Sequence, residues 1–386
     1  MSRLIVTFSA SDYTGASRMG FEYLSALRSA GFTLDIVIAP YEGEQTSLRG
    51  VLETNGFQPI VRDWFSSFIN LSAVKSLALL AESRKASCLI SMNQGDVKTT
   101  GPAARMAGLS YIAFAQNLRK FHGRFPVRVL KEWGYKREMR AAARVISVSN
   151  TVCDEHRNRF GVSKDRSVVV VNGVDLKRFK REHINRSALR RHFNWDDDEA
   201  ISLNVGRITL QKNQLELVDV FFKICEKKPD QKKRLLFVGA PAGNDFGYFE
   251  QLKDKIQSSI HRDKVELLGW RDDIPDLLSA SDIYVHPAKW EGWPLAPTEA
   301  MAAACPVVMT DCSGEPSGLI QGENCFCTQN GDMYAFSDAW ITLLNMSDHD
   351  RRELGRKGQK IALKYYDIEK LKASFVEAIQ EVVEDV

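Results

Sequence analysis

Residues 283–310 read IYVHPAKWEGWPLAPTEAMAAACPVVMT, and this stretch indicates the fold class. Residues 283–286 and 306–310 are short runs with β-branched side chains, which favour buried strands. Residues 298–304 lie between them and are mostly alanine, which favours a helix. A strand, a helix and a second strand in this order predict a parallel βαβ unit.

The same alternation of strand and helix extends through both halves of the chain. Expected strands lie at residues 4–8, 34–38, 87–92, 111–115, 145–148 and 168–171, and again at 201–205, 234–238 and 265–268. Expected helices lie at 18–30 and 214–227, and the pattern of 361–386 indicates mostly helix. Residues 177–198 are polar, and we interpret them as an interdomain linker. Two parallel sheets in series predict a ligand site beside the carboxyl ends of their strands.

The composition is that of a globular protein with room for two domains in its 386 residues. Hydrophobic residues make up 44% and charged residues 26%, which excludes a disordered or fibrous chain. No stretch approaches the ~18 apolar residues of a membrane-spanning helix. We interpret the short apolar start as a first strand and not as a signal peptide. The seven cysteines are irregularly spaced, so we expect free thiols and a reducing, cytoplasmic compartment.

The formal net charge of +3 conceals two halves of opposite sign. Residues 1–180 carry 26 Lys and Arg against 15 Asp and Glu, whereas residues 181–386 carry 26 against 34. Ten of the basic residues lie in 105–144, with aromatic and aliphatic residues between them and only two acidic ones. Two interpretations of that segment fit equally: a surface for anionic membrane lipid, or a solvated amphipathic helix packed on its own domain. Neither implies a nucleic acid.

Three groups of residues suit chemistry on a charged ligand. Arg207 follows an expected strand and Lys212 precedes an expected helix, so both cations could hold a diphosphate, although a solvated loop explains them equally well. Glu291 and Glu299 flank a Gly- and Pro-containing loop, and their carboxylates suit sugar hydroxyls. The alternative is that one is a surface residue and the other lies in the first turn of a helix, where the helix dipole favours a negative charge. The turn at Gly15 fits neither common phosphate-binding pattern, so an ordinary turn is the simpler interpretation.

Taken together, the motifs give a specific resemblance over nearly the whole chain. They are RVISVSNTV (144–152), NGVDLKRF (172–179), VGRITLQKN (205–213), FVG (237–239), VELLGWRDDIPDLLSASDIYVHP (265–287) and EGWPLAPTEAMA (291–302). In this order they resemble the retaining nucleotide-sugar glycosyltransferases of the GT-B fold, specifically glycosyltransferase family 4. Glu291 and Glu299 have the spacing of that family's paired glutamates, and Arg207 with Lys212 resembles its cationic pair.

The resemblance implies a role for each matching residue. Arg207 and Lys212 would bind the diphosphate and stabilise the leaving group, and Glu291 would contact the donor sugar, so these three are the expected catalytic residues. Glu299 would bind the ribose, and the amides of Leu295 and Ala296 would bind a phosphate. The expected donor-binding set is Gly15, Gly206, Arg207, Lys212, Gly239, Glu291, Gly292, Leu295, Ala296 and Glu299. The family uses no metal and no cofactor; the nucleotide-diphosphate sugar is a co-substrate.

The chain also departs from the family pattern. Gln116 stands where the family usually has a histidine; glutamine can bind a sugar hydroxyl but cannot carry a proton. Asn117 and His122 are nearby, and with Gln116 they are the expected sugar or acceptor contacts. Ala304 replaces a common glycine, and Ser317 stands where a glutamate is frequent. We expect these changes to tune the donor and the acceptor.

The resemblance implies an α/β protein of GT-B fold, with two Rossmann-like domains facing a central cleft. We expect an acceptor-binding domain at 1–180, a nucleotide-sugar-binding domain at 181–365, and a helix at 366–386 that packs back on the first. The expected function is retaining sugar transfer to a glycan or lipid-linked glycan in surface polysaccharide or lipopolysaccharide biosynthesis. The enzyme would lie in the cytoplasm or peripherally at the inner face of the cytoplasmic membrane. Two alternatives remain: a small soluble acceptor, or a non-catalytic nucleotide-sugar-binding subunit.

Overall fold

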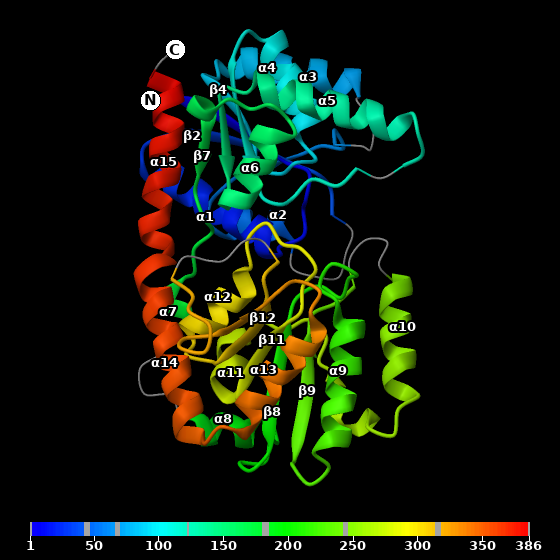
Figure 1. Cartoon of the computed structure of the whole chain (residues 1–386). Helices are drawn as coiled ribbons and strands as arrows, with labels where there is room; N and C mark the ends of the chain where they lie inside the picture. Colours follow the sequence, from blue (N-terminus) through cyan, green and yellow to red (C-terminus); the bar gives the residue numbers. More distant parts are fainter. Residues whose placement is uncertain are drawn as a thin grey trace. The chain divides into compact units, whose positions relative to one another are not determined.

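The computed structural model describes residues 2–41, 47–65, 70–121, 123–179, 185–241, 246–312 and 318–384. The chain divides into two units (Figure 1). Unit 1 comprises Met1–Gly173 with Glu369–Val386, and unit 2 comprises Val174–Ile368. Each unit is built on a parallel sheet, as the sequence predicts. The domain boundary expected at 180/181 falls outside the described residues.

Unit 1 has a seven-stranded parallel sheet in the order β3-β2-β1-β4-β5-β6-β7. Its strands are β1 (Arg3–Phe8), β2 (Thr33–Ile38), β3 (Ile60–Val61), β4 (Cys88–Ser91), β5 (Ser110–Ala115), β6 (Arg144–Ser147) and β7 (Ser167–Val169). Its helices are α1 (Gly15–Ser29), α2 (Leu48–Thr54), α3 (Leu71–Arg84), α4 (Val97–Met106), α5 (Val127–Ala141), α6 (Asn150–Asn158) and α15 (Ile368–Glu384), with a 3-10 turn η1 (Lys164–Arg166). Strand β1 is central: Leu4 is opposite Leu34 of β2 and Cys88 of β4.

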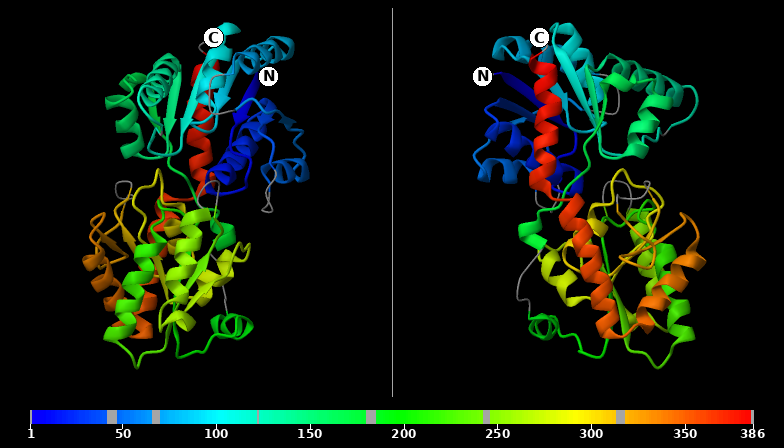
Figure 2. Two further views of the ribbon diagram at one scale, coloured as in Figure 1. Left: turned by 90° about the vertical axis from the view of Figure 1, so that its right-hand side faces the viewer. Right: turned by 60° about the vertical axis from the view of Figure 1, so that its left-hand side comes forward.

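The C-terminal helix α15 packs on the sheet and helices of unit 1 (Figure 2). The Phe375 ring stacks on Tyr23 of α1 at 4.0 Å between centroids and meets Phe114 of β5 edge-on at 5.4 Å. All three rings are buried. Ion pairs join Lys372 to Glu22 and Glu381 to Arg144 at 2.7 Å each. Residues about 350 apart in sequence therefore share one core.

Unit 2 has a six-stranded parallel sheet in the order β10-β9-β8-β11-β12-β13. Its strands are β8 (Ala200–Val205), β9 (Lys233–Val238), β10 (Val265–Leu267), β11 (Ile283–His286), β12 (Val307–Thr310) and β13 (Phe326–Thr328). Its helices are α7 (Leu176–Phe179), α8 (Arg186–His192), α9 (Gln214–Lys227), α10 (Phe246–Gln257), α11 (Ile274–Ala280), α12 (Leu295–Ala302), α13 (Met333–Asn345) and α14 (Asp348–Tyr365), with a 3-10 turn η2 (Arg262–Lys264).

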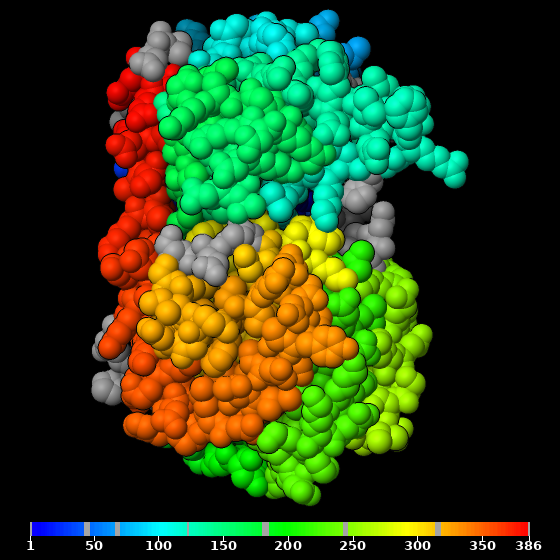
Figure 3. Space-filling view, viewed as in Figure 1, coloured from blue at the N-terminus to red at the C-terminus, as the bar shows by residue number. Residues whose placement is uncertain are grey.

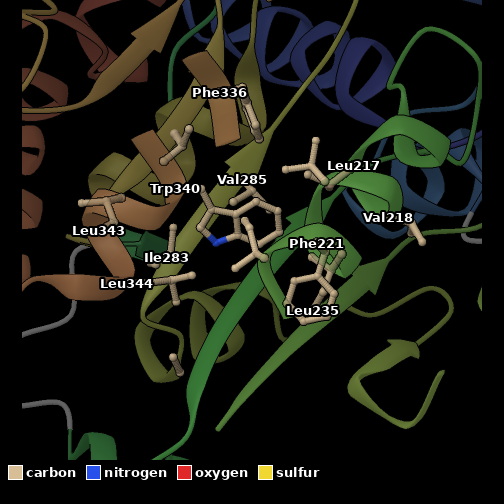
Figure 4. Close-up of a cluster of buried hydrophobic side chains, with 14 of the residues drawn as sticks. Leu217, Val218, Phe221, Leu235, Ile283, Val285, Phe336, Trp340, Leu343 and Leu344 are labelled. Atoms are coloured by element: carbon tan, nitrogen blue, oxygen red, sulfur yellow. The ribbon is translucent and has the colours of Figure 1, made fainter. Parts of the chain in front are cut away.

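The core of unit 2 gathers around Trp340 of α13 (Figure 4). Its indole stacks on Phe221 of α9 with 5.6 Å between centroids, and the indole Nε1–H donates to Ser202 Oγ of β8 at 2.9 Å. The buried indole therefore has both an aromatic contact and a hydrogen-bond partner, as a buried tryptophan requires. This core fixes β8 and α9, between which the loop with Arg207 and Lys212 lies. All seven cysteines are free, as expected.

The segment interpreted as a linker, 177–198, belongs to unit 2, and that interpretation is wrong for its described part. It contains α8, and Arg190 of this helix is fully buried. The Arg190 guanidinium donates to Asp282 Oδ2 at 3.1 Å and to the Ala280 carbonyl at 3.0 Å. A buried charge is retained when it is paired and hydrogen-bonded in this way. One charged residue of this polar segment thus lies in the interior, while most of its other described charged residues are exposed.

Three helix boundaries also differ from expectation. Helix α1 begins at Gly15, three residues before the expected start at Arg18. Helix α12 begins at Leu295, three residues before the expected start at Thr298. Pro297 lies in the first turn, where proline is tolerated because an amide at that position has no hydrogen-bond partner within the helix. The helical stretch expected at 361–386 is two helices, since α14 ends at Tyr365 and α15 begins at Ile368. Between them the Tyr366 carbonyl accepts a hydrogen bond from the Val174 amide at 2.7 Å.

Candidate functional site in unit 2, and polar residues of unit 1

The candidate site lies at the carboxyl ends of β8 and β11, where the strand order of unit 2 changes direction. Strand β8 leads into Gly206 and Arg207, and β11 leads into the loop that carries Glu291. Adjacent strands whose connections run to opposite sides leave room for a ligand between the loops that follow them. The topology therefore brings together two loops that are far apart in sequence.

Glycines at two strand ends allow the backbone to approach itself closely. Gly239, directly after β9, has φ +141°, and a Cβ there would lie 1.9 Å from the Gly206 carbonyl oxygen. The Gly206 amide donates to Val238 at 2.9 Å. A Cβ at Gly206 would lie 3.4 Å from the Lys212 side chain. A side chain at Gly239 would therefore clash with the backbone, whereas at Gly206 the contact with Lys212 is ordinary and the constraint is its φ of +157°.

Lys212 and Glu291 form an ion pair between the two loops. The Lys212 Nζ donates to Glu291 Oε1, and both side chains are mostly buried, at 16% and 8% exposure. Gln211 supports the loop that carries Glu291: its Nε2 donates to the Trp290 carbonyl at 2.8 Å and to Glu291 Oε2 at 3.3 Å. The backbone adds a bond from the Lys289 amide to the Gln211 carbonyl at 2.8 Å. The pair is therefore held in position from both loops.

His286, the last residue of β11, is in contact with the Glu291 carboxylate. Its Nε2 is 3.3 Å from Glu291 Oε1, and its Nδ1 is 3.3 Å from the Tyr284 hydroxyl. Burial lowers the pKa of His286, so the ring is neutral near pH 7. Burial alone would raise the pKa of Glu291, but Lys212 and His286 together lower it to about 2. Glu291 is therefore a carboxylate at neutral pH and can accept hydrogen bonds, but it cannot act as a proton donor.

Glu299 and the first turn of α12 lie on the other side of the Glu291 loop. The Glu299 side chain is buried, at 5% exposure. Gly292 is buried too, and the Leu295 amide donates to the Trp293 carbonyl at 2.9 Å. Ala296 is the second residue of α12, in the first turn, where helix amides have no intrahelical partner. Of the two amides expected to bind phosphate, that of Leu295 thus has a partner within its own loop.

Arg207 is exposed, in contrast to the paired Lys212. Its backbone carbonyl accepts a hydrogen bond from Gln214 Nε2 at 2.8 Å, which fixes the loop. The guanidinium makes no ion pair with any residue within the described ranges. Unit 2 therefore presents one paired and one unpaired cation near the end of β8, an arrangement that suits a ligand with two phosphates.

The polar residues of unit 1 gather where β1 and β4 end, again at the change of strand direction. Asp96 is fully buried; its carboxylate accepts from the Ser9 amide at 2.5 Å and the Asn93 amide at 3.1 Å, and Thr7 Oγ1 is 3.3 Å away. Burial raises the pKa of Asp96 to about 7, although these hydrogen bonds lower it. Asn93 Oδ1 in turn accepts from the Ala10 amide at 3.1 Å.

Gln116, one of the expected acceptor contacts, directly follows β5 and lies beside the polar residues around Asn93 and Asp96. Its Nε2 donates to the Met92 carbonyl at 2.7 Å, whereas its Oε1 is buried without a hydrogen-bond partner among the described residues. Asn117 uses its Oδ1 for the Leu118 amide at 2.9 Å. His122 lies outside the described residues. Gly15 is the first residue of α1.

Sequence reasoning missed His286, Gln211 and Asp96. The run Asn93–Asp96 directly after a buried strand is a usable signal for Asp96, because polar residues at that point lie at the ligand edge of a parallel sheet. His286 ends a buried strand, a position at which a histidine usually belongs to the core. Within the described ranges, no group of three or more His, Cys, Asp or Glu side chains could hold a metal ion. The helices described there include none with the length and apolarity to cross a bilayer.

Comparisons with curated proteins give partial matches. The chain is 28% identical over 244 residues to UDP-Gal:alpha-D-GlcNAc-diphosphoundecaprenol alpha-1,3-galactosyltransferase of Escherichia coli, covering 62% of this chain and 61% of that protein. It is 30% identical over 156 residues to the lipopolysaccharide core biosynthesis mannosyltransferase LpsB of Rhizobium meliloti, covering 40% and 43%. The chain thus spans about three fifths or less of these relatives.

Solved structures match over the whole length. HepE of Anabaena in complex with UDP has a TM-score of 0.81 at 18% identity, with 99% of this chain and 100% of that chain covered. Sucrose-phosphate synthase of Thermosynechococcus elongatus has a TM-score of 0.78 at 17% identity, with both chains covered to 100%. At such identities these likenesses establish the fold.

Family models match both parts of the chain. Residues 13–178 match the model described as Glycosyltransferase Family 4, and residues 185–361 match the one described as Glycosyl transferases group 1. The first range lies mostly in unit 1 and the second lies entirely in unit 2. The chain therefore belongs to the family 4 type of glycosyltransferases with the GT-B fold.

Proposed function

We propose that the protein is a retaining, metal-independent glycosyltransferase that moves a hexosyl group from a nucleotide-diphosphate sugar, without a further cofactor, to a glycan or lipid-linked glycan. The observation that carries the proposal is the buried pair of Lys212 and Glu291 beside the unpaired Arg207 at the edge of the unit 2 sheet. Two cations at this edge suit a diphosphate, and a carboxylate held ionised suits sugar hydroxyls. UDP is the first nucleotide to test, because the E. coli relative is named for a UDP-sugar.

The proposed mechanism begins with a change of partner at Lys212. Without a donor, the ammonium is neutralised by Glu291. A bound diphosphate contacts Arg207 and competes with Glu291 for this ammonium, and Glu291 then turns its oxygens to the hydroxyls of the transferred sugar. His286 keeps the carboxylate in place during the exchange, since it contacts the same oxygen at 3.3 Å. As the bond between the anomeric carbon and the diphosphate oxygen breaks, an acceptor hydroxyl forms the new glycosidic bond at that carbon and its proton passes to the departing diphosphate. Both cations stabilise the charge that develops on this leaving group, an effect of about 3–4 kcal/mol for one such donor.

The other expected residues have supporting parts in the proposal. Glu299 would bind the ribose, and the Ala296 amide would donate to a phosphate. In unit 1, Gln116 Oε1 would accept a hydrogen bond from a substrate hydroxyl, because a buried acceptor without a partner is costly unless a ligand satisfies it. This role replaces the acid–base role that glutamine cannot fill.

The proposed acceptor is a glycan or lipid-linked glycan of surface polysaccharide or lipopolysaccharide biosynthesis, in the cytoplasm or at the inner face of the cytoplasmic membrane. Support comes from the names of two relatives, one acting on a diphosphoundecaprenol-linked sugar and one in lipopolysaccharide core biosynthesis. A small soluble acceptor is the second candidate. It is favoured by a relative named mannosylfructose-phosphate synthase, from Agrobacterium fabrum, which is 24% identical over 216 residues.

A thermal-shift screen with UDP-, GDP-, ADP- and dTDP-sugars tests the donor site, because a ligand that binds only the folded state raises its stability. We expect one nucleotide class to raise the melting temperature of the wild type and to lose that effect in Lys212→Met. Release of the nucleoside diphosphate with an added acceptor then distinguishes an enzyme from a binding subunit. A protein whose melting temperature responds to none of the four classes would contradict the proposal.

A further inference from the structure

The N-terminal half of helix α5 and the residues just before it expose an unusual number of apolar side chains. Phe125, Leu130 and Trp133 are 77%, 64% and 61% exposed, and Val127 and Val129 are exposed as well. All described residues from 123 to 130 are exposed. In Figure 3 the teal segment that includes them projects from the surface of unit 1. Isolated exposed apolar residues are ordinary, but five within nine residues form a patch that needs an explanation.

The helix packs on its own domain through a different face. Tyr135, Glu138 and Met139 are the buried residues of α5. Leu130 and Trp133 are three residues apart and share a face, whereas Trp133 and Tyr135 point in nearly opposite directions around the helix. Packing on unit 1 is therefore satisfied without Leu130 and Trp133. The packed face agrees with the second interpretation of the basic segment, and it leaves the opposite face of the helix exposed.

Basic residues lie close to this apolar patch in the chain, and the nearby acidic ones are already paired. Glu132 is paired with Arg159 at 2.8 Å, and the buried Glu138 is paired with Arg105 and Arg137. In contrast, Arg124 and Arg128 make no ion pair with any residue in the described ranges. Arg137 lies over the Trp133 ring at 5.5 Å, so one cation and the indole form a single surface. The patch is therefore apolar, and Arg124 and Arg128 are exposed close to it in the chain.

We propose that the exposed N-terminal part of α5 and the residues just before it dock on the surface of an anionic lipid bilayer, with Phe125, Val129, Leu130 and Trp133 as the apolar side chains and the exposed Arg124 and Arg128 as the nearby cations. The charge of the patch selects this occupant: anionic headgroups neutralise the arginines while the acyl boundary accepts the apolar side chains. Tryptophan favours this interface because its ring is apolar with one polar edge. The inference deepens the proposed function, on which it rests for its purpose, since a lipid-linked acceptor would lie in the same membrane.

Sedimentation of the full-length protein with vesicles tests the proposal. Vesicles with about 30% phosphatidylglycerol are compared with pure phosphatidylcholine, with no sugar nucleotide present. Leu130→Ser/Trp133→Ser removes two apolar side chains of the patch, and Arg124→Glu/Arg128→Glu removes the charge. Each cation near an anionic surface changes partitioning about fivefold, so the charge variant should bind at least about 25-fold more weakly. Salt should weaken binding of the wild type.

Matched control variants use helix α3 and exposed lysines of the same unit. Leu71→Ser/Leu79→Ser changes two side chains that are 77% and 54% exposed, and Lys75→Glu/Lys164→Glu changes two exposed cations. Both controls should bind vesicles as the wild type does. Equal loss in the controls, or equal binding to neutral vesicles, would overturn the proposal.

Two further outcomes would also overturn it. The wild type could fail to sediment with anionic vesicles, or it could form a dimer that only Leu130→Ser/Trp133→Ser dissociates, in which case the patch is a self-association surface. Because all changed side chains are exposed, unaltered melting temperatures verify that the variants fold. Release of nucleoside diphosphate with a lipid-free acceptor is measured separately, so a failure of vesicle binding is distinguished from a failure of the transfer reaction.

Discussion

Replacing Glu291 by glutamine should destabilise the protein in a pH-dependent manner. The pKa of Glu291 is lowered from 4.5 to about 2 in the folded protein. A difference of this size corresponds to about 3 kcal/mol of stabilisation of the charged carboxylate at pH 7. The glutamine is neutral, so the Lys212 ammonium keeps its burial without its counter-charge. We therefore expect Glu291→Gln to lower the free energy of unfolding by about 3 kcal/mol, in line with breaking one partner of a buried pair.

The sign of the pH dependence follows from the direction of the shift. A lowered carboxyl pKa stabilises the folded state above the unfolded value of about 4.5, and this stabilisation disappears as the pH falls toward 2. The difference between wild type and Glu291→Gln should therefore be constant from pH 8 to about 5 and shrink below that. Urea unfolding followed by tryptophan fluorescence measures it, and Trp290 next to the pair is a local reporter.

Two controls make this prediction specific. Glu250→Gln breaks an exposed pair with Lys253, and it should cost less than about 1 kcal/mol. Lys212→Met combined with Glu291→Gln removes both charges, so its cost should be smaller than the sum of the two single variants. A loss in Glu291→Gln no larger than in Glu250→Gln, or one that persists unchanged at pH 3, would refute the reasoning.

Three further outcomes are expected. Phe375→Ala removes a ring stacked at 4.0 Å on Tyr23 and should lower the free energy of unfolding by about 3–5 kcal/mol in urea titrations; a loss below 1 kcal/mol would contradict the packing of α15. Asp96 has a raised pKa of about 7, so the wild type should lose up to about 4 kcal/mol between pH 4 and pH 7, and Asp96→Asn should flatten that dependence in the same titrations. Ala304 has φ +57°, so Ala304→Gly should raise the stability by about 1 kcal/mol, measured as an increase in melting temperature.

The parallel sheets could be predicted because each central strand is a short apolar run that must be buried on both faces. Among the edge strands, β7 and β10 could be predicted from the apolar runs at 168–171 and 265–268, whereas β3, with two residues, and β13, with three, could not. Such short pairings depend on their neighbours more than on their own composition. The segment around Arg190 misled the prediction for a related reason. Arg186 and Arg190 pair with Asp282, more than 90 residues away in sequence, and no local pattern reveals that distant partner.

The candidate site, too, could be predicted only in part. Lys212 and Glu291 could be selected as single residues by their position after strands, and the topology brings their loops together. That they pair with each other could not be read from the chain, because 79 residues separate them. The role of His286 depends on that pairing, because its ring contacts the Glu291 oxygen that binds Lys212. Nothing in the sequence therefore gave a reason to select His286.

The central claim is that the unit 2 site transfers a sugar from a nucleotide-diphosphate donor with the help of Lys212. The most direct measurement is the rate of nucleoside diphosphate release, with the donor found in the thermal-shift screen and a glycan acceptor, for the wild type, Lys212→Met and Lys255→Ala. Lys255 forms an ion pair with Asp219 away from the site and serves as the control. We expect Lys212→Met to lower the rate by at least about 100-fold, while Lys255→Ala keeps the wild-type rate. A folded Lys212→Met variant that releases nucleoside diphosphate at the wild-type rate would contradict the claim.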